Sequence, residues 1–254
     1  MPEAALTVQI DEKRFPGVGA APAKHALGRV AFSVAPGDVV AVNGPSGCGK
    51  TTLLNLIAGL DRSFSGRIEL VPDRRLAYVF QEPRLLPWRT VEDNLRLVLG
   101  DQEDRERVRA ALAQVGLAAA SGLYASRLSL GMARRVALAR AFVIEPGLLL
   151  LDEPFVSLDE QTAGRLRRLL RELIALHRTT AILVTHNLRE AAMLARRLIL
   201  LSASPGQLIA EVEVPLSEAE RHDEPALDAF RARLLADYGL GELHQLETSL
   251  EAAR

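Results

Sequence analysis

One segment of the sequence has the residue types and the spacing of a phosphate-binding loop. It runs from Gly44 to Thr51 and satisfies every fixed position of the pattern G-x-x-x-x-G-K-[ST]. Its glycines allow successive backbone N–H groups to turn inward around phosphate oxygens. Lys50 is placed to reach the β- and γ-phosphates of ATP, and the Thr51 hydroxyl is placed to coordinate Mg²⁺. The segment therefore predicts a site for ATP and Mg²⁺.

The residues around this loop support the prediction. A buried strand is expected at 39–42 and a helix at 50–60, so the positive N-terminal end of the helix would face the phosphates. Cys48 is interpreted as a tolerated loop residue and not a nucleophile, because no histidine or second cysteine lies near it in the sequence. The residues of this segment expected to contact the nucleotide are Gly44, Pro45, Ser46, Gly47, Cys48, Gly49, Lys50, Thr51 and Thr52.

Two adjacent carboxylates end an apolar run further along the chain. Residues 148–151 are four leucines, which predict a buried strand, and Asp152 and Glu153 follow them. Asp152 suits the coordination shell of Mg²⁺. Glu153 suits positioning and deprotonating an attacking water. An acidic turn at a strand end is the alternative for the pair alone, but together with the phosphate-binding loop it indicates ATP hydrolysis.

Alternating strands and helices are expected to position these residues. Strands are predicted at 6–10, 30–34, 39–42, 76–80, 148–151, 180–184 and 197–201. Helices are predicted at 50–60, 101–117, 129–144, 160–177 and 187–196. The alternation favours a mostly parallel sheet with helices on both faces. We expect the strand at 6–10 to be an edge strand and residues 16–28 to form a loop.

The predicted fold class is therefore α/β. We expect a P-loop NTPase whose mostly parallel sheet is flanked by helices, with an N-terminal antiparallel β portion and an inserted helical subdomain at about 83–128. The nucleotide-binding domain would span residues 1–214, and a C-terminal helical extension would span 215–254. One face of a helix in this extension would carry its apolar residues, which are Leu227, Phe230, Leu234 and Leu235.

Composition limits the classes of function. The net charge of −1 gives no global basic field, so we expect no nucleic-acid partner. The single cysteine allows no disulfide within the chain, which fits a reducing compartment. No apolar run approaches the ~18 residues of a spanning helix, and no signal peptide is evident. We expect any role at a membrane to come through a partner.

Four further motifs occur in a fixed order. Segment 129–132 (SLGM) and the helix after it resemble the LSGGQ signature of the ATP-binding subunits of ABC transporters. Gln81 resembles the Q-loop glutamine of that family, Asp159 the D-loop aspartate and His186 the switch histidine. With the phosphate-binding loop and the acid pair, the resemblance covers about residues 6–210.

The resemblance implies that two copies of the chain form a head-to-tail dimer. Each ATP would lie between the phosphate-binding loop of one copy and the signature of the other, contacted there by Ser129, Gly131 and Met132, with Asp159 also at the nucleotide. Ser129 is a good N-cap, and the helix that it starts can present N–H groups to a γ-phosphate. Leu130 replaces a glycine of the family pattern, and Met132 replaces a glutamine. A leucine still offers its N–H if its φ is negative, so we expect ATP binding to survive and unusual kinetics to arise here.

The resemblance also implies the remaining site residues. The catalytic residues would be Glu153, His186 and Gln81, and the ligands of Mg²⁺ would be Thr51, Gln81 and Asp152. The adenine base would stack on an aromatic residue before the loop, for which Phe15 is the candidate. The alternative is that this phenylalanine is an apolar residue at a strand end.

Residues 81–94 resemble the importers of nitrate, sulfonate and taurine. In that family this segment meets the transmembrane permease subunits, which would place the chain peripherally on the cytoplasmic face of the inner membrane, with a substrate-binding protein as an indirect partner. Trp88 has two interpretations, an anchor at this interface or a residue that fills the core between the two lobes. Segment 132–135 is also reminiscent of lipid-trafficking members. Two further alternatives are a soluble ABC-type ATPase and a regulator without turnover, and the intact Glu153 and His186 argue against the second.

Overall fold

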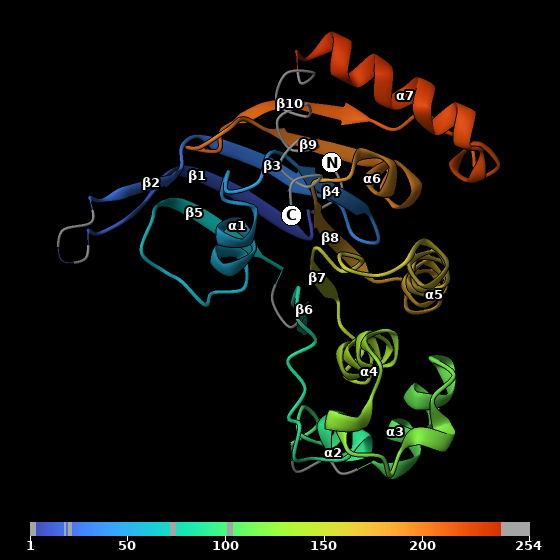
Figure 1. Ribbon diagram of the computed structural model, residues 1–254. Helices are drawn as coiled ribbons and strands as arrows, with labels where there is room; N and C mark the ends of the chain where they lie inside the picture. The colour runs from blue at the N-terminus through green and yellow to red at the C-terminus, as the bar shows by residue number, and fades with distance from the viewer. Residues whose placement is uncertain (1–3, 18, 20–21, 72–74, 101–103, 240–254) are drawn as a thin grey trace. The chain divides into compact units, whose positions relative to one another are not determined.

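The computed structural model describes residues 4–17, 19, 22–71, 75–100 and 104–239, and these form two compact units. Unit 1 comprises Met1–Pro72 and Ile182–Arg254, and unit 2 comprises Asp73–Ala181. Figure 1 shows the elements of both. Among the described residues, no helix combines the length and the apolar character that crossing a membrane requires.

Unit 1 contains an antiparallel sheet near the N-terminus. Strand β1 (Leu6–Phe15) pairs with β2 (Lys24–Leu27), β3 (Val30–Val34) and β5 (Ser65–Leu70), all antiparallel. The prediction of an edge strand at 6–10 is wrong, because β1 has neighbours on both sides. Alternating burial shows only that one face is covered and carries no information on neighbours. The loop predicted at 16–28 is also wrong in part, since β2 lies within it.

A second sheet in unit 1 holds the strands that carry functional residues. Its strands follow the order β10–β9–β4–β8, where β4 is Val39–Asn43, β9 is Arg197–Leu201 and β10 is Leu208–Glu213. Strand β8 is Thr180–Thr185, and its residues from Ile182 on belong to unit 1. Strands β4 and β9 are parallel, with Val42 opposite Ile199, and β10 is antiparallel to β9. The residues of β8 are all buried, as expected of a central strand.

The helices of unit 1 are α1 (Lys50–Ile57), α6 (Leu188–Leu194), the short 3-10 helix η3 (Glu220–His222) and α7 (Glu224–Asp237). Helix α7 lies beside α6 (Figure 1). It buries three of the four apolar residues predicted to share a face, Leu227, Phe230 and Leu234, and half-buries Leu235. The predicted domain boundary between residues 214 and 215 falls within unit 1 and stays a prediction.

Unit 2 contains parallel strands β6 (Leu76–Val79) and β7 (Leu148–Asp152). Its α-helices are α2 (Val91–Arg96), α3 (Arg105–Gln114), α4 (Leu130–Phe142) and α5 (Glu160–His177), and its 3-10 helices are η1 (Ala118–Ala120) and η2 (Ala125–Arg127). Helix α4 packs against α2, α3 and α5, and its buried face includes Val136 and Leu138. The helical character predicted for 83–128 is confirmed, whereas a subdomain with those bounds stays a prediction.

Several predicted elements match the structure closely. The helix at 160–177 and the strand at 197–201 are confirmed to the residue. The helix predicted at 101–117 is shorter, because Asp104 caps its start and Gly116 has a left-handed φ of 68° near its end. Residues 101–103 lie outside the described residues.

Candidate nucleotide-binding site

The phosphate-binding loop connects β4 to α1, as the sequence predicts. Gly47 and Gly49 have φ values of 78° and 104°, which L side chains rarely adopt. A Cβ on Gly49 would lie 2.6 Å from Leu27 Cδ2 and 2.8 Å from the carbonyl oxygen of Ala26. Only glycine therefore fits at this position, both for its backbone conformation and for its close contact with β2.

The Cys48 side chain is fully buried beneath the loop. A Cβ on Gly44 would lie 2.9 Å from Cys48 Sγ, and a Cβ on Gly206 would lie 2.1 Å from the carbonyl oxygen of Cys48. Two glycines thus make room for this residue, whose N–H donates to the Pro45 carbonyl at 3.2 Å. Cys48 therefore packs in the core of unit 1, which its position in the sequence motif did not indicate.

Lys50 is buried within the loop. Its Nζ donates to the carbonyl oxygens of Gly44 at 2.6 Å and Pro45 at 3.1 Å, so the side chain folds back over the loop. Ser46 and Thr51 are exposed and Thr52 is half-buried. A buried ammonium, exposed hydroxyls and a glycine-rich backbone at the start of α1 are the groups that bind phosphate oxygens and a hard cation. The residues present therefore fit MgATP.

Asp152 is the last residue of β7, and its carboxylate is buried. The Tyr78 hydroxyl on the neighbouring strand donates to Asp152 Oδ2 at 3.4 Å. Burial, reinforced by the charge of Asp152, raises the pKa of Tyr78 far above its ordinary value, so this hydroxyl stays protonated as a donor. The sequence did not predict this contact, because only the parallel pairing of β6 with β7, which sets Tyr78 opposite Leu150, brings Tyr78 near Asp152.

Glu153 follows the strand with a left-handed backbone, φ 46°. This conformation is uncommon for a residue with a Cβ and clusters at functional sites. The turn that it starts is closed by a hydrogen bond from Val156 N to the Glu153 carbonyl at 3.3 Å. The two carboxylates thus lie in sequence at the carboxyl end of β7, one at the end of the strand and one in the turn.

The signature segment begins α4. Ser129 caps the helix, its Oγ accepting from Met132 N at 3.3 Å, as predicted. Leu130 has a negative φ as the first helical residue, and its side chain is 42% exposed, so its replacement of glycine meets no obstacle. A Cβ on Gly131, in contrast, would lie 3.0 Å from Thr162 Cγ2. A side chain is therefore crowded at the second of these positions and not at the first.

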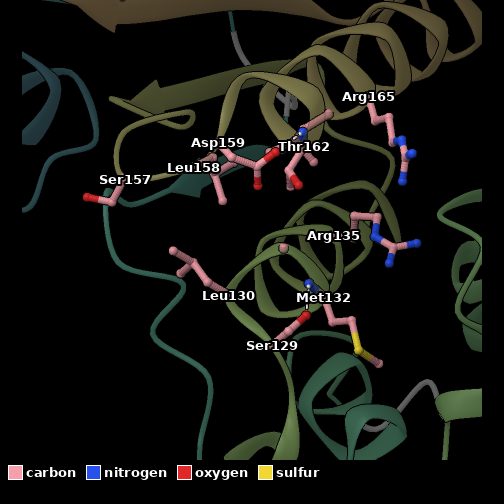
Figure 2. Close-up of a pocket in the computed structure, with 11 residues that line it drawn as sticks. Ser129, Leu130, Met132, Arg135, Ser157, Leu158, Asp159, Thr162 and Arg165 are labelled. Atoms are coloured by element: carbon pink, nitrogen blue, oxygen red, sulfur yellow. Dashed lines mark hydrogen bonds between the residues drawn. The ribbon is translucent and has the colours of Figure 1, made fainter.

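The signature and the D-loop line a single pocket in unit 2, with a volume of about 430 Å³. Figure 2 shows Ser129, Leu130 and Met132 on one side of it and Ser157, Leu158, Asp159 and Thr162 on the other. Asp159 caps α5 by accepting from Thr162 N at 2.9 Å. Hydrogen bonds from the side chain and then from the backbone of Thr162 lower the pKa of Asp159. Ser157, with φ 62°, is another left-handed residue of this segment.

His186 follows β8 in unit 1, and its neighbours on both sides are held by hydrogen bonds. The Thr185 carbonyl accepts from Asn43 Nδ2 at 3.0 Å, and both residues are buried. Thr185 Oγ1 donates to Glu190 at 2.9 Å and accepts from Asn187 N at 3.1 Å, while Asn187 caps α6. Asn43 directly precedes the phosphate-binding loop, so one amide connects the start of that loop to the backbone beside His186.

Gln81 is exposed after the end of β6. Phe80 stacks on Tyr78, with ring centroids 4.0 Å apart, and the Arg84 guanidinium lies 3.8 Å from the Phe80 centroid. Trp88 is 68% exposed. Trp88 therefore does not lie in the core of unit 2, because a large apolar ring in that core would be covered. The alternative that it fills a core between the two lobes stays a prediction.

Phe15 ends β1 with 37% of its surface exposed. Lys13 Nζ lies 4.5 Å from the centroid of its ring, which is cation–π distance. The ring is accessible for stacking on a base, and its proposed contact with adenine stays a prediction.

The predicted site residues divide between the two units. Unit 1 holds Phe15, the loop from Gly44 to Thr52 and His186, and unit 2 holds Gln81, the acid pair, the signature and Asp159. Within unit 2 the signature and D-loop residues come together, and within unit 1 the loop is tied to the His186 segment.

Known proteins resemble this chain over most of its length. The sequence profile of the family described as ABC transporter matches residues 27–156. An aliphatic sulfonates import ATP-binding protein SsuB 2 of Burkholderia lata is 44% identical over 216 residues, which cover 82% of this chain and 79% of the relative. An SsuB 1 protein of Pseudomonas syringae pv. syringae is 37% identical, with coverage of 93% and 97%.

Solved structures of the same kind also match. The dimeric structure of MJ0796, a bacterial ABC transporter cassette, gives a TM-score of 0.72 at 27% identity, covering 84% of this chain and all of the other. A post-hydrolysis state of that cassette bound to ADP and Pi gives 0.71 at 26% identity, with the same coverage. The match confirms the predicted fold class. The chain belongs to the ABC transporter family, as an ATP-binding and ATP-hydrolysing subunit.

Proposed function

We propose that this chain hydrolyses ATP to drive an importer of aliphatic sulfonates. The observation that carries the proposal is the similarity to ATP-binding proteins named for aliphatic sulfonates import, at 37% to 44% identity over most of both chains. The segment at 81–94, which resembles the same branch of importers, supports it independently of those names.

Binding of the triphosphate falls to the loop. The backbone N–H groups from Ser46 to Thr52 and the Lys50 ammonium bind the phosphate oxygens, and Phe15 stacks on the adenine. Lys50 already lies within the loop, where it would exchange its carbonyl acceptors for phosphate oxygens. Mg²⁺, when bound, neutralises charge that develops on the phosphates. Thr51, Gln81 and Asp152 are its proposed ligands.

Hydrolysis requires a positioned water. Glu153 accepts a proton from this water as its oxygen attacks the γ-phosphorus, and the bond to the β–γ bridging oxygen breaks to give ADP and phosphate. His186 donates a hydrogen bond to the γ-phosphate, and Gln81 orients the water. The left-handed backbone at Glu153 supports a catalytic role, because strain of this kind is retained where function needs it.

The second half of each nucleotide site comes from a second copy. Ser129, Gly131 and Met132, at the N-terminal end of α4, would bind the γ-phosphate of the ATP held by the partner's loop, with Asp159 beside them. The dimeric state of the similar cassette supports this arrangement.

The permease would dock at segment 81–94. The exposed Trp88 supports this, because exposed tryptophans often carry a large share of interface energy. The chain would then lie peripherally on the cytoplasmic face of the inner membrane, and the permease would connect it to a substrate-binding protein.

A growth experiment tests the substrate. A strain lacking the gene should not grow on an alkanesulfonate as its sole sulfur source, and should grow normally on sulfate. The wild-type gene should restore growth, whereas Lys50→Ala and Glu153→Gln should not. Growth on alkanesulfonate without the gene, accompanied by loss of nitrate use, would reject the sulfonate and indicate a nitrate importer.

Biochemistry tests the two key residues separately. Purified Lys50→Ala should lose most of its ATP affinity, measured with a fluorescent ATP analogue, because the ammonium contributes charge-assisted hydrogen bonds. Lys24→Ala, at an exposed position in β2, is the matched control. Glu153→Gln should bind ATP normally and accumulate as an ATP-bound dimer in size-exclusion chromatography; undiminished turnover would refute the role of Glu153.

A further inference from the structure

Helix α4 carries a buried guanidinium on Arg134, four residues after its first residue, Leu130. Arg134 is 4% exposed, and it forms no ion pair with a carboxylate among the residues that the structure describes. Burial lowers the pKa of Arg134, although an arginine stays protonated because its ordinary pKa is so high. A buried charge without an acidic partner is costly and requires specific hydrogen-bond acceptors.

The acceptors of Arg134 are the two ends of the turn that begins with Glu153. Nη2 donates to the Val156 carbonyl at 3.0 Å, and Nη1 approaches the Glu153 carbonyl at 3.5 Å, the outer limit of a hydrogen bond. Arg134 Nε has no hydrogen-bond partner within the described part of the chain. The planar fork of the guanidinium therefore spans the turn, and its stronger contact is at Val156.

The backbone at the two ends of this turn is strained. Glu153 is the first residue of the turn and Ser157 directly follows it. Both have left-handed backbones, at φ 46° and 62°. Two weak backbone hydrogen bonds close it, from Val156 N to Glu153 O and from Leu158 N to Phe155 O, each at 3.3 Å. A backbone that residues with a Cβ adopt reluctantly persists only where its surroundings fix it. The guanidinium supplies such a fixed contact from a rigid helix.

We propose that Arg134 is a positioning residue that holds the turn from Glu153 to Val156 in the conformation that ATP hydrolysis requires. It acts through the backbone, and its effect rests on the proposed role of Glu153 as the base. A carboxylate displaced by about 1 Å loses much of its effect on the water that it orients, which can cost on the order of 100-fold in rate.

Arg134 lies on the same helix as the signature segment. Ser129 caps this helix, and the signature segment at 129–132 is proposed to bind the nucleotide held by the second copy. The arginine thus connects that segment to the hydrolytic turn of its own copy through about one turn of rigid helix. Sequence alone did not reveal this, because Arg134 and Val156 are 22 positions apart.

The test compares Arg134→Gln and Arg134→Lys with Arg107→Gln. Arg107 lies on α3 in the same unit and pairs with Glu145 at 3.1 Å, away from the turn. In Arg134→Gln we expect kcat to fall on the order of 10- to 100-fold, while the affinity for ATP changes by less than about twofold because the loop is untouched. Arg134→Lys, which keeps the charge but has a single donor nitrogen in place of the fork, should recover part of kcat. Arg107→Gln should keep the wild-type kcat.

A second measurement separates positioning from general packing. Single-turnover hydrolysis is compared in the wild-type and Glu153→Gln backgrounds, with thermal unfolding as the check on folding. If Arg134 acts through Glu153, Arg134→Gln should slow hydrolysis strongly in the first background and by less than about twofold in the second. Equal slowing in both would overturn the proposal, as would a kcat near wild type for Arg134→Gln.

The outcomes also separate this inference from the proposed function. If Glu153→Gln itself hydrolyses ATP like the wild type, the assignment of the base fails. If Glu153→Gln is inactive while folded Arg134→Gln is fully active, only the positioning role fails. Should Arg134→Gln not fold, Arg134→Lys carries the test. A wild-type rate for Arg134→Lys, which has a single donor nitrogen, would count against the fork geometry.

Discussion

At the start of α4, two neighbouring residues differ in their tolerance for a side chain. The Leu130 side chain is 42% exposed, whereas a Cβ on Gly131 would press on the methyl group of Thr162 at 3.0 Å. The family pattern has glycine at both positions, and the structure explains why this chain can depart from it at the first alone. Gly131 has no left-handed φ, so any preference for glycine at this position comes from this one contact.

Gly131→Ala should therefore slow ATP turnover by separating the signature from α5. Alanine favours helix by up to about 1 kcal/mol over glycine, so backbone preference opposes the loss and cannot cause it. We expect kcat to fall on the order of 10-fold and Thr162→Ser, which removes the methyl group, to restore most of it. Phosphate-release kinetics measure the effect.

The matched control is Gly122→Ala, since a Cβ there would meet no atom within 4 Å. Failure of Thr162→Ser to rescue Gly131→Ala would show that the clash is not the cause.

Individual site residues differ in how well the sequence alone predicts them. The sequence predicts the loop, the acid pair and Ser129, because each belongs to a short segment with its own characteristic residue types and spacing. Tyr78, Arg134 and Asn43 were missed, because each contacts a partner that only the fold brings near. Nothing in a linear pattern specifies such pairs.

At the scale of elements, α6 is a short helix held at both ends by the C-terminal segment. Near its start Arg189 forms a bidentate ion pair with Asp228 of α7. At its end the buried Arg221 donates to the carbonyls of Ala192 and Ala195, and also to that of Val214. Since α6 follows His186, the C-terminal segment supports an element next to a proposed catalytic residue.

Arg221→Met should destabilise unit 1, because it leaves buried carbonyls at the end of α6 without their charged donor. Each lost charge-assisted hydrogen bond costs about 1.5–3 kcal/mol, and we expect a total loss of about 2–4 kcal/mol. Urea unfolding followed by circular dichroism measures it, with Arg168→Met on the exposed face of α5 as the control. Equal stability of the two variants would contradict this role of Arg221.

An ion pair between elements predicts a pH effect. Buried Lys13 of β1 contacts Asp61 after α1 at 2.6 Å, and the hydrogen bond from Lys13 lowers the pKa of Asp61. Because a lowered folded-state pKa stabilises the ionised form, the contribution is fully present above about pH 4, the ordinary pKa of aspartate. It is lost as the pH falls through the folded-state pKa.

Asp61→Asn should therefore reduce stability near neutral pH and converge on the wild type in acid. Asp61 is partly exposed, so the difference at pH 7 should be only about 0.5–1 kcal/mol. Unfolding free energies measured across the acidic range give the comparison. A constant difference at every pH would exclude ionisation of Asp61 as its origin.

The elements that sequence missed share a physical cause. Strand β5 is almost entirely exposed and β10 only alternates between exposed and half-buried, so neither carries the apolar signal of a strand. The buried strands β7 and β8 and the amphipathic helix α5 were predicted well, since burial imposes the pattern that reveals them.

At the scale of the whole molecule, the motifs are divided so that one chain is proposed to supply half of each of two sites. A head-to-tail dimer would place the loop of one copy against the signature of the other. This arrangement predicts complementation between defective copies. Lys50→Ala removes the loop function, and Ser129→Arg blocks the signature with a bulky charge where the γ-phosphate should lie.

Mixed dimers distinguish a site shared between two copies from a complete site within each copy. When Lys50→Ala and Ser129→Arg are on different copies, one site has both defects and the other keeps an intact loop and an intact signature. When both changes are on one copy and the other copy is wild type, each site has one defect. We therefore expect ATP hydrolysis from the first mixture, above either parent alone, and little from tandem-affinity-purified dimers of the second. Higher activity in the second pairing would instead mean that each chain forms a complete site, because the wild-type copy would then work alone.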